Sequence, residues 1–174
     1  HYDELHGSDD MQHRQLLRNL TKRIQKGEYV VYLQPKYHLK SHMGIGAEAL
    51  IRQKHPEFGI LPPSEFIPVL ESNGVIRYID LFVFEEVCKL LQKWQRDDMV
   101  VSLNFSRITL MEDDIINSMK KILDMYDFPR QCLEIEMTES TMENCSAMVY
   151  KTVQEIRQLG LRISLDDFGI RYSN

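Results

Sequence analysis

Four segments of the sequence each carry one oxygen-bearing side chain in a strand-like pattern. These side chains are Glu48, Asn104, Glu136 and Asp166, and each stands at or near the carboxyl end of its segment. Side chains of a strand alternate between two faces, and in each segment the oxygen ligand lies opposite the apolar residues. Carboxylate and amide oxygens are the ligands that Mg²⁺ and Mn²⁺ prefer. The pattern therefore predicts a divalent-cation site at one rim of a sheet.

Two further residues extend this prediction. Asp167 follows Asp166 directly and adds a carboxylate for a second ion. Two ions about 4 Å apart can activate a water molecule and neutralise a phosphodiester. Arg52 lies four residues after Glu48, and its forked guanidinium suits a phosphate oxygen.

Each residue also has a more ordinary interpretation when it is taken alone. A single Glu48 would be a solvated rim residue, Asn104 a turn former, and Arg52 one half of a surface ion pair. The pair Asp166-Asp167 before Phe168-Gly169 is also typical of a turn or a helix cap. In all four segments, however, the oxygen-bearing side chain lies on the polar face and at or near the carboxyl end. This shared pattern favours the metal site.

The elements that must position these residues alternate along the chain. Helical apolar spacing predicts helices over 16–24, 76–94, 115–123 and 149–159, and strands are expected over 29–39, 44–52, 100–106, 131–138 and 161–167. Residues 56–63, rich in proline and glycine, are expected to form a loop. This alternation predicts an α/β fold with parallel strands, whose carboxyl ends all lie on one side. A full (β/α)8 barrel has eight strands, so we expect roughly the first five of an incomplete barrel.

Composition narrows the class of protein. The chain has 174 residues, 43% of them hydrophobic and 27% charged, as in one globular domain. A net charge of −5 argues against DNA or RNA as partners. Three cysteines without a CxxC pair, and no apolar run of about 20 residues, predict a cytoplasmic location, although a parent protein could be anchored in a membrane. Residues 1–13 are expected to be a linker from an upstream domain.

The motif Glu48-Ala49-Leu50, followed by Arg52, resembles the motif that names the EAL domains. Other matching segments occur in the family's order and spacing over residues 28–174: Tyr32-Leu33-Gln34-Pro35, His55-Pro56, Phe66-Ile67-Pro68, Glu71-Ser72-Asn73-Gly74, Asn104-Phe105-Ser106, Glu136-Met137-Thr138-Glu139-Ser140 and Asp166-Asp167-Phe168-Gly169. The resemblance implies an EAL domain over 14–174, incomplete at its carboxyl end. EAL domains are modified (β/α)8 TIM barrels that hydrolyse cyclic di-GMP to linear pGpG with Mg²⁺ or Mn²⁺.

The resemblance also implies a role for each matching residue. Glu48, Asn104, Glu136 and Asp166 resemble the ligands of the first metal, and Asp166 and Asp167 those of the second. Glu139 resembles the residue that braces the loop after the fifth strand, and is counted with Glu48, Asp166 and Asp167 as catalytic. Gln34 resembles a guanine contact, Leu50 a substrate contact and Arg52 the phosphate contact. A homodimer and an upstream GGDEF domain are implied as well.

The sequence departs from the family pattern in three ways. Ile170-Arg171 replaces a Thr-Gly pair, and an arginine would be strained if that glycine has a positive φ. Gln53 stands where tryptophan is common, which predicts altered contacts at the site rim. The family has three further active-site residues, a lysine, a glutamate and a glutamine, on strands that follow the segment matched here. The given sequence does not include those strands, so the chain alone is expected to be inactive. Two alternatives therefore stay open: a degenerate EAL domain that binds cyclic di-GMP without cutting it, and a dimerising segment without a ligand.

Overall fold

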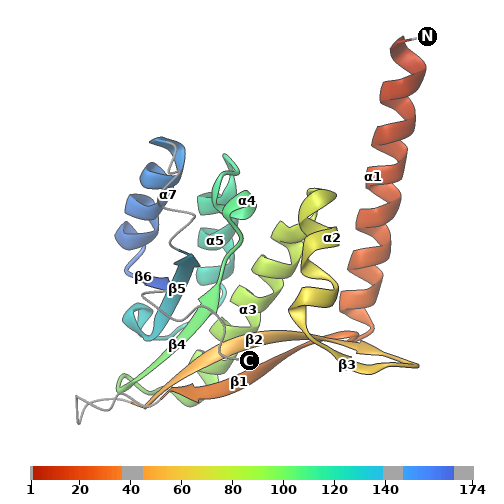
Figure 1. The fold of residues 1–174 in the computed structure, drawn as a ribbon. Coiled ribbons are helices and arrows are strands. Elements are labelled where there is room, and N and C mark those ends of the chain that lie inside the picture. The colour runs from red at the N-terminus through yellow and green to blue at the C-terminus, as the bar shows by residue number, and fades with distance from the viewer. Residues whose placement is uncertain (1, 37–44, 139–146, 167–174) are drawn as a thin grey trace.

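The computed structural model describes residues 2–36, 45–138 and 147–166 (Figure 1). The helices are α1 (Tyr2–Gln25), α2 (Ile67–Ser72), α3 (Ile76–Trp94), α4 (Arg107–Leu110), α5 (Ile115–Leu123) and α7 (Ala147–Gln158). The strands are β1 (Tyr29–Lys36), β2 (Ile45–His55), β3 (Gly59–Leu61), β4 (Met99–Asn104), β5 (Leu133–Thr138) and β6 (Arg162–Asp166). Short 3₁₀ turns cover Pro63–Glu65 and Arg130–Cys132. The α/β class is confirmed.

The six strands form one mixed sheet in the order β1-β2-β4-β5-β6, with β3 beside β2. Strands β2, β4, β5 and β6 are parallel, as predicted. The expectation that all strands are parallel is wrong for β1, which pairs antiparallel with β2. The segment between Lys36 and Ile45 is shorter than the dozen or more residues that a parallel crossover needs. The carboxyl end of β1 therefore lies beside the amino end of β2.

The predicted loop over 56–63 contains the additional strand. Gly59–Leu61 pairs antiparallel with the end of β2, from Gln53 to His55. The Nδ1 atom of His55 accepts backbone hydrogen bonds from Glu57 at 3.2 Å and Phe58 at 3.3 Å, and these bonds close the tight turn. The pattern of proline and glycine marked the turn correctly but hid a strand of three residues.

The main hydrophobic core lies between the sheet and helices α3, α5 and α7. The sheet contributes the apolar face of β2, β4 and β5, and the helices contribute the apolar stripes that the sequence predicted. Leu103, Leu133 and Ile135 are fully buried in it. Because side chains alternate along a strand, the opposite face of the same strands carries Glu48 and Glu136. The core thus fixes which face presents the polar side chains.

Helix α1 packs on a second, smaller core and extends well beyond the sheet (Figure 1). Leu20 is buried there with Tyr29 and Phe66. The predicted stop is confirmed: Gly27 has φ of 73°, and Glu28 N–H donates to the carbonyl of Arg23 at 3.0 Å. The helix begins at Tyr2, earlier than expected, since the chain has no proline before Pro35 to interrupt it. The linker role of residues 1–13 stays a prediction.

No helix in the described ranges is both long and apolar enough to cross a lipid bilayer.

Candidate functional site

Glu48, Asn104 and Glu136 lie on the same face of three adjacent parallel strands. In the sheet register Glu48 is opposite Ser102, and Asn104 is opposite Glu136. The backbone of Asp166 in β6 is opposite Thr138, two residues beyond Glu136. The four predicted ligands therefore follow a diagonal across β2, β4, β5 and β6. Their role as metal ligands stays a prediction.

Two of the predicted ligands are in direct contact. The Asn104 Nδ2 atom donates a hydrogen bond to Glu48 Oε1 at 2.9 Å. The Asn104 side chain is exposed and that of Glu48 is 20% exposed, so both are open to a ligand. Asn104 thereby orients the Glu48 carboxylate and keeps its own amide oxygen available as an acceptor.

Glu136 is the buried member of the group, at 5% exposure. Its Oε1 atom accepts a hydrogen bond from Lys36 Nζ, while its buried Oε2 atom has no hydrogen-bond partner among the described residues. A buried carboxylate oxygen without a partner is costly, and a cation would satisfy it. The oxygen donors of Glu48, Asn104 and Glu136 therefore fit a hard divalent cation. Within the described ranges no group of three or more His, Cys, Asp or Glu residues is gathered closely enough to hold a metal by itself.

Sequence reasoning missed Lys36, which reaches the site from β1. Its Nζ atom donates to Ser102 Oγ at 2.9 Å and to Glu136, and lies 3.6 Å from Glu48 Oε2. Burial alone would lower the pKa of Lys36, but the bond to Glu136 and the charges of Glu136 and Glu48 outweigh it and raise that pKa. The ammonium therefore carries its charge between the two carboxylates.

The predicted substrate contacts lie on the same face. Gln34 is paired across the strands with Glu48 and is exposed. Leu50 and Arg52 follow Glu48 at intervals of two residues, which places them on its face of β2. The Arg52 guanidinium donates to the carbonyl of Ile51 at 2.8 Å. Asp167, Glu139, Ile170 and Arg171 lie outside the described residues.

Gln53 does not lie at the site rim, as its position in the motif had suggested. It is 6% exposed and alternates with Arg52, so it points to the opposite face of β2 from Glu48. Its neighbours across the strands are Tyr29 and Leu61. A change at this position therefore alters packing behind the sheet rather than contacts at the rim.

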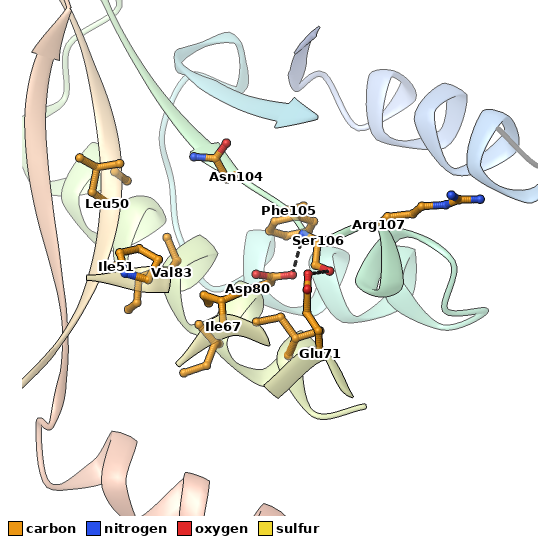
Figure 2. A pocket seen from close by; sticks show the side chains of 14 residues that line it. Leu50, Ile51, Ile67, Glu71, Asp80, Val83, Asn104, Phe105, Ser106 and Arg107 are labelled. Carbon is orange, nitrogen blue, oxygen red and sulfur yellow. Dashed lines mark hydrogen bonds between the residues drawn. The ribbon is translucent and has the colours of Figure 1, made fainter. Parts of the chain in front are cut away.

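A cleft of about 540 Å³ opens beside the predicted ligands (Figure 2). Its walls come from the middle of β2, from α2 and α3, and from residues 104–107. Leu50 and Asn104 lie at its border, and Ile67 and Val83 provide apolar wall. The volume falls within the range of small-molecule sites in proteins. Glu48 and Glu136 do not line the cleft, which borders the predicted ligand group through Asn104.

Asp80 is a second residue that sequence reasoning missed. It is buried in α3 at 6% exposure, and its Oδ2 atom accepts from the Ser106 backbone N–H at 3.0 Å and from Thr109 Oγ1 at 2.5 Å. Glu71 accepts from Ser106 Oγ at 2.8 Å (Figure 2). These bonds hold the corner that follows Asn104. The available signal was a carboxylate within the apolar stripe of the 76–94 helix, next to Ile79 and before Val83.

Asp80→Asn is expected to flatten the pH dependence of stability. Burial, opposed in part by the bonds from Thr109 and Ser106, raises the pKa of Asp80 from 3.8 to about 7. The folded protein then binds a proton that the unfolded chain has lost between about pH 4 and pH 7, so stability falls as pH rises through that window. The asparagine variant should lose this slope, worth at most about 4 kcal/mol.

Urea unfolding of the full-length protein at pH 5, 6, 7 and 8 measures the slope. Asp97→Asn, at an exposed position after α3, is the matched control and should follow the wild-type curve. Parallel curves for all three proteins would show that Asp80 does not titrate in this range.

This chain is similar in sequence and in fold to known proteins. The profile of the EAL domain family covers residues 17–174. The signaling protein YkoW of Bacillus subtilis is 37% identical over 158 residues, which are 89% of this chain and 20% of YkoW. The cyclic di-GMP phosphodiesterase PdeR of Escherichia coli is 30% identical over 158 residues, 90% of this chain and 24% of PdeR.

A solved structure of the PaMucR phosphodiesterase in complex with c-di-GMP superposes with a TM-score of 0.78 at 28% identity. It covers 92% of this chain, and this chain covers 66% of it. The chain thus spans about a fifth to a quarter of YkoW and PdeR and about two thirds of the solved phosphodiesterase chain. The match to a TIM-barrel fold over part of its length agrees with the partial barrel expected from the sequence. Because the family profile covers most of its length, this chain belongs to the EAL domain family.

Proposed function

We propose that this protein is a phosphodiesterase that hydrolyses cyclic di-GMP to linear pGpG with Mg²⁺ or Mn²⁺. The observation that carries the proposal is the unpartnered, buried Oε2 of Glu136 on the same face as the Glu48–Asn104 pair. A divalent cation would satisfy this oxygen, which has no hydrogen-bond partner among the described residues. Relatives that act on or bind this dinucleotide supply the substrate class: PdeR is a cyclic di-GMP phosphodiesterase, and PaMucR was solved with c-di-GMP.

Each residue of the site has a distinct part in the proposal. Glu48, Asn104 and Glu136, with Asp166, would hold the first cation, and Asp166 with Asp167 the second. Bound divalent cations supply a water molecule of lowered pKa and neutralise charge on the phosphodiester. Asn104 keeps the Glu48 carboxylate oriented toward the site through the bond at 2.9 Å.

Substrate binding is assigned to the neighbouring residues of the same face. Arg52 would exchange its bond to the carbonyl of Ile51 for a phosphate oxygen, which a guanidinium binds with two parallel donors. Leu50 borders the cleft, which offers an apolar wall to one part of the dinucleotide. Gln34, exposed beside Glu48, can offer its amide to a guanine edge. Glu139 is proposed to brace the loop after β6. A cytoplasmic location, a homodimer and an upstream GGDEF domain belong to the same proposal.

A second candidate function is that of a receptor that binds cyclic di-GMP without hydrolysing it. The Ile170-Arg171 pair, which follows Asp166-Asp167 in the sequence, favours this alternative, because a change there can disturb the second cation. The predicted ligands Glu48, Asn104 and Glu136 are nevertheless all present, which favours the enzyme.

The test is incubation of the full-length protein with cyclic di-GMP and MnCl₂, followed by chromatography for pGpG. Cyclic di-AMP is the matched substrate control and should stay intact. Formation of pGpG supports the phosphodiesterase. Calorimetric binding of cyclic di-GMP without pGpG would replace it by the receptor, and absence of both binding and product would remove both functions.

A further inference from the structure

We propose that Lys36 is a built-in cation of the metal-free protein: it holds Glu48 and Glu136 together and must release Glu136 when a divalent cation binds. This inference rests on the proposed metal site and adds a residue to it. Lys36 is here a positioning residue, acting through the carboxylates rather than on substrate.

Lys36 joins three strands of the sheet to its own. From β1 its Nζ atom reaches Glu48 on β2, Ser102 on β4 and Glu136 on β5. Ser102 is buried, and its hydroxyl lies 3.5 Å from the carbonyl of Ala47, which it approaches as a donor. The hydroxyl is thus held between the sheet backbone and the ammonium. Such convergence from separate strands is a built arrangement rather than a flexible surface contact.

The sheet leaves space for this side chain at Gly46, which is opposite Lys36 in the register. A Cβ atom at Gly46 would lie 3.7 Å from Lys36 Cβ and 3.3 Å from the carbonyl oxygen of Val100. The first distance is an ordinary van der Waals contact and the second is tight, so a side chain at Gly46 would press on the backbone of β4 beside the lysine. The antiparallel pairing of β1 is what places Lys36 at this point, beside the amino end of β2.

The charges explain why the site needs a resident cation. Glu136 is buried, and a buried carboxylate is strongly destabilising unless a positive group accompanies it. Lys36 supplies this positive charge, since among the described residues it forms ion pairs with both Glu48 and Glu136. Lys36 itself is 37% exposed, so its side chain has a path to solvent if it is displaced.

A divalent cation at the same carboxylates would meet the Lys36 ammonium at close range. Like charges repel strongly at such distances, even in a solvated site. Lys36 should therefore stabilise the metal-free fold and weaken cation binding. Replacing it by a neutral side chain should have opposite effects on these two quantities, which a merely structural lysine would not produce.

The experiment compares wild-type full-length protein with Lys36→Met, using MnCl₂ as the probe and no nucleotide. Calorimetry should show Mn²⁺ binding at least about tenfold tighter in the variant. Thermal unfolding in EDTA should begin about 3–6 °C lower in the variant. Saturating Mn²⁺ should then raise its unfolding temperature by more than it raises that of the wild type.

Lys54→Met is the matched control, because Lys54 is an exposed lysine on β2 and should change neither quantity. Lys36→Gln provides a second variant that can still donate a hydrogen bond to Glu136, and it too should bind Mn²⁺ more tightly. Equal Mn²⁺ affinity in wild type and both Lys36 variants would overturn the inference and leave the proposed function intact. Absence of Mn²⁺ binding in every protein would instead remove the proposed metal site, and the inference with it.

Discussion

Replacing Glu48 by glutamine is expected to lower kcat/KM for hydrolysis of cyclic di-GMP by at least about a thousandfold, or about 4 kcal/mol. Glutamine has the size of glutamate but lacks its charge, so it is a poor ligand for Mg²⁺ or Mn²⁺. Its amide oxygen can still accept the bond from Asn104, which keeps the local structure. The loss would therefore report on charge at the cation site. Chromatography of pGpG at several substrate concentrations measures it.

Glu134→Gln is the matched control for this experiment. Glu134 lies on the same face of β5, two residues before Glu136, and its Oε1 atom accepts from Ser164 Oγ at 3.0 Å. It undergoes the same chemical change on the same sheet but outside the predicted ligand group. Activity should stay within about threefold of wild type in this control. Full activity in Glu48→Gln, or equal losses in both variants, would contradict the assignment of Glu48.

The position of the predicted ligands followed from strand alternation, which is a local property of the sequence. Leu133, Ile135 and Met137 are buried against the helices, so Glu134 and Glu136 face the other way. The same argument holds for Asn104 beside Leu103. The parallel strands β2, β4, β5 and β6 could likewise be predicted, since a helix with a clear apolar stripe lies between most of them.

The parts that could not be predicted depend on contacts between distant segments. The short connection between Lys36 and Ile45 indicates that β1 runs antiparallel to β2, but nothing in the sequence indicates that Lys36 meets Glu136, 100 residues later. Asp80 was visible in the sequence as a polar residue in an apolar stripe. Its partners Ser106 and Thr109 are provided by another strand end and helix, however, and only the fold brings them to it.

In the mixed sheet, the predicted cation ligands and the positive charge of Lys36 come from strands that run in different directions. Asn104 and Asp166 end the parallel strands β4 and β6, the usual position of active sites in α/β barrels. The expectation of a carboxyl-end position is wrong for Glu48, which is near the amino end of β2, a strand of 11 residues that continues to His55. The opposing positive charge of Lys36 comes from β1, one of the two strands that pair antiparallel with β2, and lies 3.6 Å from Glu48 Oε2. The reversed first strand thus gives this site its internal counter-charge.

Ile135→Ala is expected to destabilise the protein by about 2–5 kcal/mol. Ile135 is fully buried in the main core, directly before Glu136 in β5. The truncation would leave a cavity between the sheet and the helices at the strand that carries the buried carboxylate. The expected decrease in the midpoint of thermal unfolding is about 4–20 °C for a domain of this size. This is a large part of the stability of an ordinary domain, which is about 5–15 kcal/mol.

Ile60→Ala is the matched control, because Ile60 lies on β3 and is 48% exposed, so its loss opens no cavity. Its unfolding midpoint should stay within about 2 °C of wild type. Equal midpoints for Ile135→Ala and wild type would contradict the packing that orients Glu136. If the destabilisation is found, Mn²⁺ affinity should also fall, because a loosened β5 no longer holds Glu136 beside the Glu48–Asn104 pair. Packing of β5 against the core would then control the position of the carboxylate on its opposite face.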